Sequence, residues 1–198
     1  MTDIDQSNDL QQCVSTIVLK CRSIIKMIKK STILTSYIDK LKPAHRIQKS
    51  LSIDCKSRWN STKHMLENLI SHKQLIIELH SNKYDLSLTD KQIQKLASLE
   101  LSNNEWRIVA FIESMLTPFD NATKLMSGQK YCTIGTCLFA IRKIKAYLDA
   151  HLDNNAFMNE LNNALLEQLV KYIDDDVEQM NLIIVCMNFN SLTFDLYY

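Results

Sequence analysis

The sequence predicts a mainly α-helical protein, and three of its features support that prediction. The 198 residues include only two glycines and two prolines, whereas folds made of many strands need both residue types at their tight turns. Hydrophobic residues make up 46% of the chain, which is enough for a core, so a disordered chain is not expected. Apolar residues recur at spacings of three and four, the period of amphipathic helices.

The first fifty residues predict two helices. The first has a basic outer face and a stripe of apolar residues at helical spacing, which consists of Val14, Ile17, Val18, Cys21, Ile24, Ile25 and Ile28. Ser31 and Thr32 interrupt this pattern. Leu34, Ile38 and Leu41 then indicate a second, short helix, which Pro43 should end because proline cannot continue a helix.

The middle of the chain predicts a short strand followed by two helices. Residues 51–54 alternate apolar and polar side chains, the pattern of a strand. Ser61 or Thr62 is expected to cap a helix whose apolar residues are Met65, Leu66, Leu69, Ile70, Ile76 and Ile77. Thr89 and Gln92 have the spacing of a capping box and should open the next helix. A lone strand cannot pair with itself, so its sheet partners are expected outside this chain.

Three further helices are expected in the second half, which makes about seven in all. One starts near Ser102 or Asn103, with Glu105 in its first turn, and ends at Ser127–Gly128. Pro118 should kink this helix or split it in two. Thr133 is expected to cap the next helix, and the last should start near Asn155. The tail after 175 shows no clear period.

Charge is distributed unevenly along the chain, although the formal net charge is only +1. Basic residues dominate from Lys20 to Lys63, where only Asp39 and Asp54 oppose them, and the C-terminal quarter is acidic. Clustered cations gain affinity for nucleic acids by releasing counterions from phosphates, so Lys26, Lys29 and Lys30 are candidate DNA-binding residues. Two solvated helix faces of opposite sign would give the same pattern, and charge alone favours that alternative.

Other classes of protein lack support in the sequence. The six cysteines form no C-x-x-C pair and no finger spacing, so reduced thiols are expected. The acidic, polar N-terminus does not resemble a secretory signal, and no apolar stretch has the length of a membrane span. We therefore expect neither a membrane nor a small-molecule substrate as a partner.

The most specific segment runs from Asp54 to Thr62 and reads D-x-x-S-R-W-N-S-T, followed by Met65-Leu66. It places a carboxylate at the end of the predicted strand, as metal-dependent nucleases do, although one carboxylate does not make a two-metal site. The run resembles the D-x-x-T-R-W-N-S-T-x-x-M-L signature of hAT-superfamily transposases, including their BED-finger-linked relatives. Ser57 departs from the usual Thr. A second family landmark, E-W followed by L-x-P-F-x-x-A-T-x-x-x-S, is matched between Glu105 and Ser127.

The resemblance covers about residues 10–175 and implies a mainly α fragment of a ribonuclease H-like core, with one or two of its strands, together with the large helical insertion that interrupts this core. It divides the chain into basic amphipathic helices (1–50), an active-site strand and turn (51–60), the helical insertion lobe (61–175) and a divergent tail (176–198). Intact family members are nuclear homo-oligomers that cut and rejoin DNA with Mg²⁺ held by an Asp, Asp, Glu triad. Asp54 matches the second Asp and is thus the candidate catalytic and metal residue. Arg58 and Trp106 are candidate DNA contacts. The alternative for Trp106 is packing in the core, and the alternative for Arg58 is an ion pair, for instance with Asp54.

The departures from the family pattern predict that this chain is not an enzyme by itself. No upstream Asp stands in a strand-like context, and the catalytic Glu, the BED finger and the dimerisation segment are not found. No bound cofactor is therefore expected in this chain. The leading interpretation is a non-catalytic transposase fragment with residual DNA or protein binding. The alternatives are a domesticated nucleic-acid-binding module, a nuclease completed by carboxylates of a partner chain, and a helical interaction scaffold.

Overall fold

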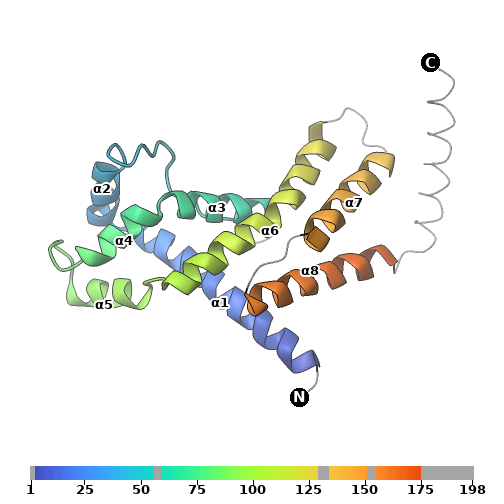
Figure 1. The fold of residues 1–198 in the computed structure, drawn as a ribbon. Coiled ribbons are helices and arrows are strands. Elements are labelled where there is room, and N and C mark those ends of the chain that lie inside the picture. The colour runs from blue at the N-terminus through green and yellow to red at the C-terminus, as the bar shows by residue number, and fades with distance from the viewer. Residues whose placement is uncertain (1–2, 56–58, 129–133, 151–154, 175–198) are drawn as a thin grey trace. The chain divides into compact units, whose positions relative to one another are not determined.

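The computed structural model describes residues 3–55, 59–128, 134–150 and 155–174, and these form eight helices (Figure 1). They are α1 (Asp3–Lys30), α2 (Thr32–Leu41), α3 (Trp59–Ser71), α4 (Lys73–Ser81), α5 (Asp90–Ser98), α6 (Asn103–Gly128), α7 (Ile134–Ala150) and α8 (Ala156–Asp174). No described residue lies in a strand, so the mainly α class is confirmed. Within the same ranges, no helix combines the length and hydropathy that crossing a membrane requires.

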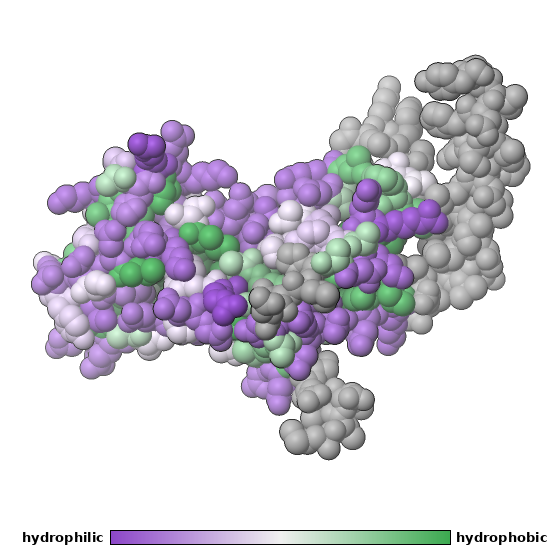
Figure 2. All heavy atoms as spheres, viewed as in Figure 1, coloured by the Kyte–Doolittle hydropathy of each residue, from purple (hydrophilic) through white to green (hydrophobic). Residues whose placement is uncertain are grey.

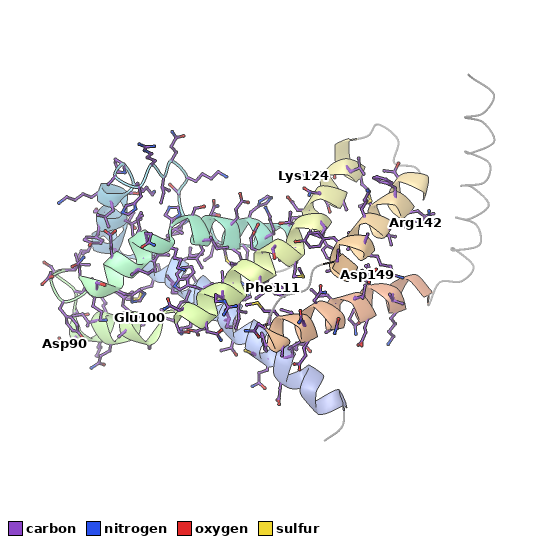
Figure 3. The ribbon with its side chains drawn as sticks, viewed as in Figure 1. Asp90, Glu100, Phe111, Lys124, Arg142 and Asp149 are labelled. Carbon is purple, nitrogen blue, oxygen red and sulfur yellow. The ribbon has the colours of Figure 1, made fainter. Side chains whose placement is uncertain are left out.

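The chain divides into two compact units, Met1–Leu116 and Thr117–Tyr198. In the first unit α1 packs against α2 and α3, and α4 packs against the same two helices. Their shared core includes the fully buried side chains of Ile24, Ile25, Leu34, Leu66, Leu69, Ile76 and Leu79. Figure 3 shows side chains filling the space between these helices, whereas Figure 2 shows mostly hydrophilic residues on the visible face. The predicted apolar stripe of the first helix is therefore the face that forms the core.

In the second unit α7 packs against α8. Leu148 of α7 and Met158 of α8 are buried. The side-chain amide of Asn162 donates a hydrogen bond to the carbonyl oxygen of Leu148 at 2.7 Å, which satisfies a buried polar group.

Several helix starts form as the local sequence predicts. At α5 the Thr89 amide donates to Gln92 Oε1 (2.9 Å) and the Gln92 amide donates to Thr89 Oγ1 (3.4 Å), which is the predicted capping box. Ser102 and Glu105 exchange the same two bonds at the start of α6, at 2.7 and 3.2 Å. Asn155 accepts a hydrogen bond from the Phe157 amide before α8 (3.0 Å). Thr133, the cap predicted for α7, lies outside the described residues.

The strand predicted at 51–54 is not confirmed, because residues 51–55 have no regular secondary structure. Strand hydrogen bonds require a neighbouring strand, and the described part of the chain contains none. The alternation also fails as a guide to burial, since Leu51 is 6% exposed and Ile53 is 40% exposed although a strand would turn both to one side.

Two predicted helices have different limits in the structure. The helix expected from Ser61 onward begins earlier, at Trp59, and ends at Ser71, and a separate helix follows from Lys73. The split of α6 at Pro118 is wrong, because the helix is continuous from Asn103 to Gly128. Proline lacks the N–H that would bond one turn back, which costs about 3 kcal/mol, and the intact turns on both sides outweigh that loss.

Two histidines are buried in the first unit. His72 is fully buried with Nδ1 2.7 Å from the Asn68 carbonyl oxygen, and His80 is 4% exposed. Burial lowers the pKa of both imidazoles in the folded protein. The unfolded chain binds protons from about pH 6.5 downward while the folded chain resists them.

We therefore predict that these two histidines leave the free energy of unfolding constant above about pH 6.5 and decrease it as the pH is lowered further. The loss should reach up to about 1.4 kcal/mol per pH unit for each histidine. Urea unfolding between pH 7.5 and 5.5 measures the effect. His80→Leu should flatten the pH dependence, because it removes one of the two buried imidazoles. An unchanged slope in this variant would contradict the prediction.

Candidate functional site

Asp54, the candidate metal ligand, is enclosed by side chains from two helices. Arg22 of α1 donates through Nε to both carboxylate oxygens, at 2.9 and 3.0 Å, and through Nη2 to Oδ2. Thr62 of α3 donates its hydroxyl to Oδ2 at 2.8 Å. The Asp54 side chain is 2% exposed. The hydrogen bonds from Arg22 hold its pKa below the usual value, with Thr62 adding to this effect and burial opposing it.

These donors do not fit the Mg²⁺ site that the family resemblance implies. Mg²⁺ requires oxygen ligands in octahedral geometry, and two-metal catalysis requires several carboxylates. Asp54 instead faces a guanidinium cation and a hydroxyl group that already donates to it. Across the described ranges, no group of three or more His, Cys, Asp or Glu side chains could hold a metal ion.

Trp106, a candidate base-stacking residue, is buried in the first unit. Its side chain projects from α6 and is 4% exposed, and the Lys73 ammonium group lies 5.6 Å from the ring centroid. Base stacking requires an exposed aromatic face. The environment of Trp106 agrees with the core-packing alternative. Arg58, the other candidate contact, lies outside the described residues.

The basic residues that the structure describes between Lys20 and Lys63 fall into two groups. The first group pairs with carboxylates: Lys20 with Glu105 (2.8 Å), Arg22 with Asp54, Lys42 with Asp39 (2.7 Å), and Lys63 with Glu67 (3.0 Å) and Glu113 (3.2 Å). Three of these carboxylates, those of Glu67, Glu105 and Glu113, lie outside the segment from Lys20 to Lys63 in which basic residues dominate the sequence. Burial acts to lower the pKa of Lys63, but its two glutamates outweigh burial and raise it.

The second group is exposed and has no carboxylate partner among the described residues. It contains Lys26, Lys29 and Lys30 of α1, Lys40 of α2, and Arg46 in the loop that follows α2. Lys49 is also exposed, and its ammonium group lies 3.9 Å from Glu67 Oε1. At about 100° per residue, Lys26, Lys29 and Lys30 lie within an arc of roughly 100° on α1, opposite its buried stripe. We call these three lysines the basic face.

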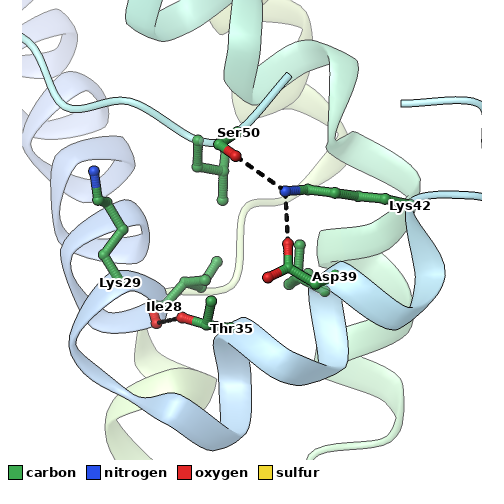
Figure 4. Close-up of a pocket in the computed structure, with 8 residues that line it drawn as sticks. Ile28, Lys29, Thr35, Asp39, Lys42 and Ser50 are labelled. Carbon is green, nitrogen blue, oxygen red and sulfur yellow. Dashed lines mark hydrogen bonds and ion pairs between the residues drawn. The ribbon is translucent and has the colours of Figure 1, made fainter. Parts of the chain in front are cut away.

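A cavity of about 230 Å³ lies beside the basic face, between the end of α1, α2 and residues 50–51 (Figure 4). Its apolar wall is formed by Ile28, Ile38 and Leu51, and its polar lining residues are Lys29, Thr35, Asp39, Lys42 and Ser50. Lys42 crosses it to donate to Asp39 (2.7 Å) and Ser50 (3.3 Å). Lys29 is thus shared between the cavity and the basic face.

Comparison with known proteins places this architecture in a family. Residues 7–115 match the ZBED1 RNase-like helical domain, and this range nearly coincides with the first unit. A Zea mays protein described as "Putative AC transposase" is 24% identical over 165 residues, which are 80% of this chain and 19% of that protein. The chain therefore spans about a fifth of the length of this relative. No solved structure matches the chain.

Proposed function

The chain belongs to the ZBED1 RNase-like helical domain family, and from this premise we propose that it is a non-catalytic part of a hAT-type transposase that associates with DNA. The association is electrostatic and independent of base sequence. It acts in the nucleus, where the DNA substrate of such a transposase is found.

The basic face is the observation that carries this proposal. The other cations of α1 after residue 19, Lys20 and Arg22, form ion pairs within the fold, whereas Lys26, Lys29 and Lys30 project into solvent. An exposed lysine that neutralises a phosphate releases condensed counterions, and this release supplies most of the free energy of non-specific DNA binding. Lys40, Arg46 and Lys49 add positive charge on the neighbouring helix and loop.

We predict that replacing Lys26, Lys29 and Lys30 together with glutamine weakens binding to a random-sequence duplex by at least about tenfold at roughly 50 mM salt. The slope of log K against log salt should become shallower by up to about 2.7, because each phosphate contact contributes about 0.9. Fluorescence anisotropy at several salt concentrations measures both quantities. The substitutions remove exposed charge only, so stability should change little.

The matched control replaces three exposed lysines of other helices, Lys91 and Lys95 of α5 and Lys145 of α7, with glutamine. This variant has the same net charge as the first. An equal loss of affinity in both variants would show that net charge rather than the basic face governs binding, and would contradict the proposal.

The absence of catalysis is the second half of the proposal. It is supported by the hydrogen-bond donors around Asp54, which occupy the carboxylate that a metal ion would need. A nuclease completed by carboxylates of a partner chain would need the Asp54 carboxylate. Loss of cleavage on Asp54→Asn in such an assembly would therefore overturn this half and leave DNA association untouched.

A further inference from the structure

We propose that Asp54 is a structural anchor that ties residues 51–55 to α1 and α3, and that Arg22 stands where a metal ion would have to bind. Arg22, Asp54 and Thr62 are called the clasp below. This assignment does not depend on DNA association. It gives the D-x-x-S-R-W-N-S-T run a role in the fold of this chain.

Four described residues of the run bond to one another in two pairs. Thr62, eight residues after Asp54, donates its hydroxyl to that carboxylate at 2.8 Å. Ser61 accepts a hydrogen bond from the Cys55 amide at 2.7 Å. The two bonds join adjacent residues before α3, Asp54 and Cys55, to adjacent residues in its first turn, Thr62 and Ser61. An aspartate and a hydroxyl residue at this spacing are therefore explained by loop closure without a metal ion.

Arg22 completes the clasp from a different helix. Its planar guanidinium matches the two oxygens of a carboxylate, which is the geometry of the strongest charge-assisted hydrogen bonds. The arginine side chain is 16% exposed and the aspartate 2%, so the pair leaves no room for the water ligands that Mg²⁺ usually keeps. A metal ion at Asp54 would have to displace a half-buried cation that has no other carboxylate partner among the described residues.

The anchor replaces the hydrogen bonds that a sheet would supply. Residues 51–55 have no strand partner in the described part of the chain, yet the Asn68 side chain of α3 donates to Ser52 at 2.9 Å, and Asp54 and Cys55 bond to the first turn of the same helix. Arg22 adds the tie to α1. Hydrogen bonds to the Ser52 and Asp54 side chains and from the Cys55 amide thus hold an irregular segment in one place, with Leu51 inserted into the core.

The first test measures metal binding in the whole chain, with Mn²⁺ as the probe for Mg²⁺. Electron paramagnetic resonance reports the free Mn²⁺ in titrations of the wild type and of Asp54→Asn, in which the amide oxygen can still accept a hydrogen bond. We expect the same Mn²⁺ uptake for both proteins. Uptake by the wild type with a Kd below about 1 mM that Asp54→Asn abolishes would overturn the assignment, because such a site requires the carboxylate.

The second test measures the anchor itself by amide hydrogen exchange. Ser61→Ala removes the acceptor of the Cys55 amide, and Thr62→Val removes a donor to Asp54 without a large change of volume. Exchange at Cys55 should become about fivefold faster or more in Ser61→Ala, which is the effect of losing one ordinary hydrogen bond. Thr16→Val, which removes an exposed helix hydroxyl, is the control. Unchanged exchange at Cys55 in both loop variants would overturn the anchor.

Discussion

Replacing Trp106 with alanine should lower the free energy of unfolding by about 3–5 kcal/mol, the usual range for a large aromatic side chain removed from a core. Trp106 is 4% exposed and lies beneath the Lys73 ammonium group, whose attraction to the ring adds to the loss. Urea unfolding monitored by circular dichroism measures the difference, since fluorescence would change with the loss of an indole.

Two control variants separate packing from DNA contact. Trp106→Phe keeps much of the buried area and should cost less than the alanine variant, with wild-type DNA affinity. Tyr84→Ala removes an aromatic side chain that is 72% exposed and should change stability by less than about 0.5 kcal/mol. A Trp106→Ala protein with near wild-type stability but weakened DNA binding would contradict core packing and support the base-stacking role that the sequence left open.

Replacing Arg22 with methionine should destabilise the protein by about 3–5 kcal/mol, because it leaves the Asp54 carboxylate buried without its cation. Methionine retains much of the apolar length of arginine, so lost packing contributes little. Adding Asp54→Asn to this variant should restore part of the stability, since the uncompensated charge is then removed. The urea midpoints of the two single variants and the double variant give the coupling free energy.

Lys20→Met is the matched control for Arg22. Lys20 lies on the same helix and pairs with Glu105, but both side chains are more exposed, at 21% and 25%. Such an ion pair contributes about 0–1 kcal/mol. If Arg22→Met costs no more than Lys20→Met, the clasp does not hold the segment as we infer.

Features that depend on neighbouring residues could be predicted from the sequence. The capping box of Thr89 and Gln92 and the start of α6 at Ser102 and Glu105 each involve residues three positions apart, so their hydrogen bonds are implied by the local pattern. The apolar stripe of α1 likewise predicts its buried face. The resemblance to hAT transposases rests on two sequence motifs, and the family match over residues 7–115 confirms it.

Features that depend on distant residues could not be predicted. The partner of Asp54 is Arg22, which lies 32 positions earlier, whereas the sequence suggested the nearby Arg58. The partner of Lys20 lies 85 positions away. Counting charges within one segment therefore overstated the basic surface, because acidic residues from α6 neutralise part of it. The sequence did contain one signal for this ion pair. Arg22 is the only arginine among the basic residues of α1, and arginine is favoured over lysine for buried bidentate pairs with a carboxylate.

The strand predicted at 51–54 is not confirmed for a related reason. Alternation over four residues indicates a strand only when a second strand is available to pair with it. In the described chain the polar side chains of this segment bond to α3 and α1 instead. Local pattern and tertiary context therefore disagree, and tertiary hydrogen bonds determine the outcome.

The salt dependence of DNA binding by the wild-type chain tests the central claim most directly. Three to five exposed cations in contact with phosphates predict saturable binding to a random-sequence duplex at roughly 50 mM salt, with a slope of log K against log salt of about −3 to −4.5. Anisotropy titrations between about 50 and 200 mM salt give this slope. Absence of binding at the lowest salt concentration, or an affinity that does not change with salt, would contradict electrostatic association through the basic face.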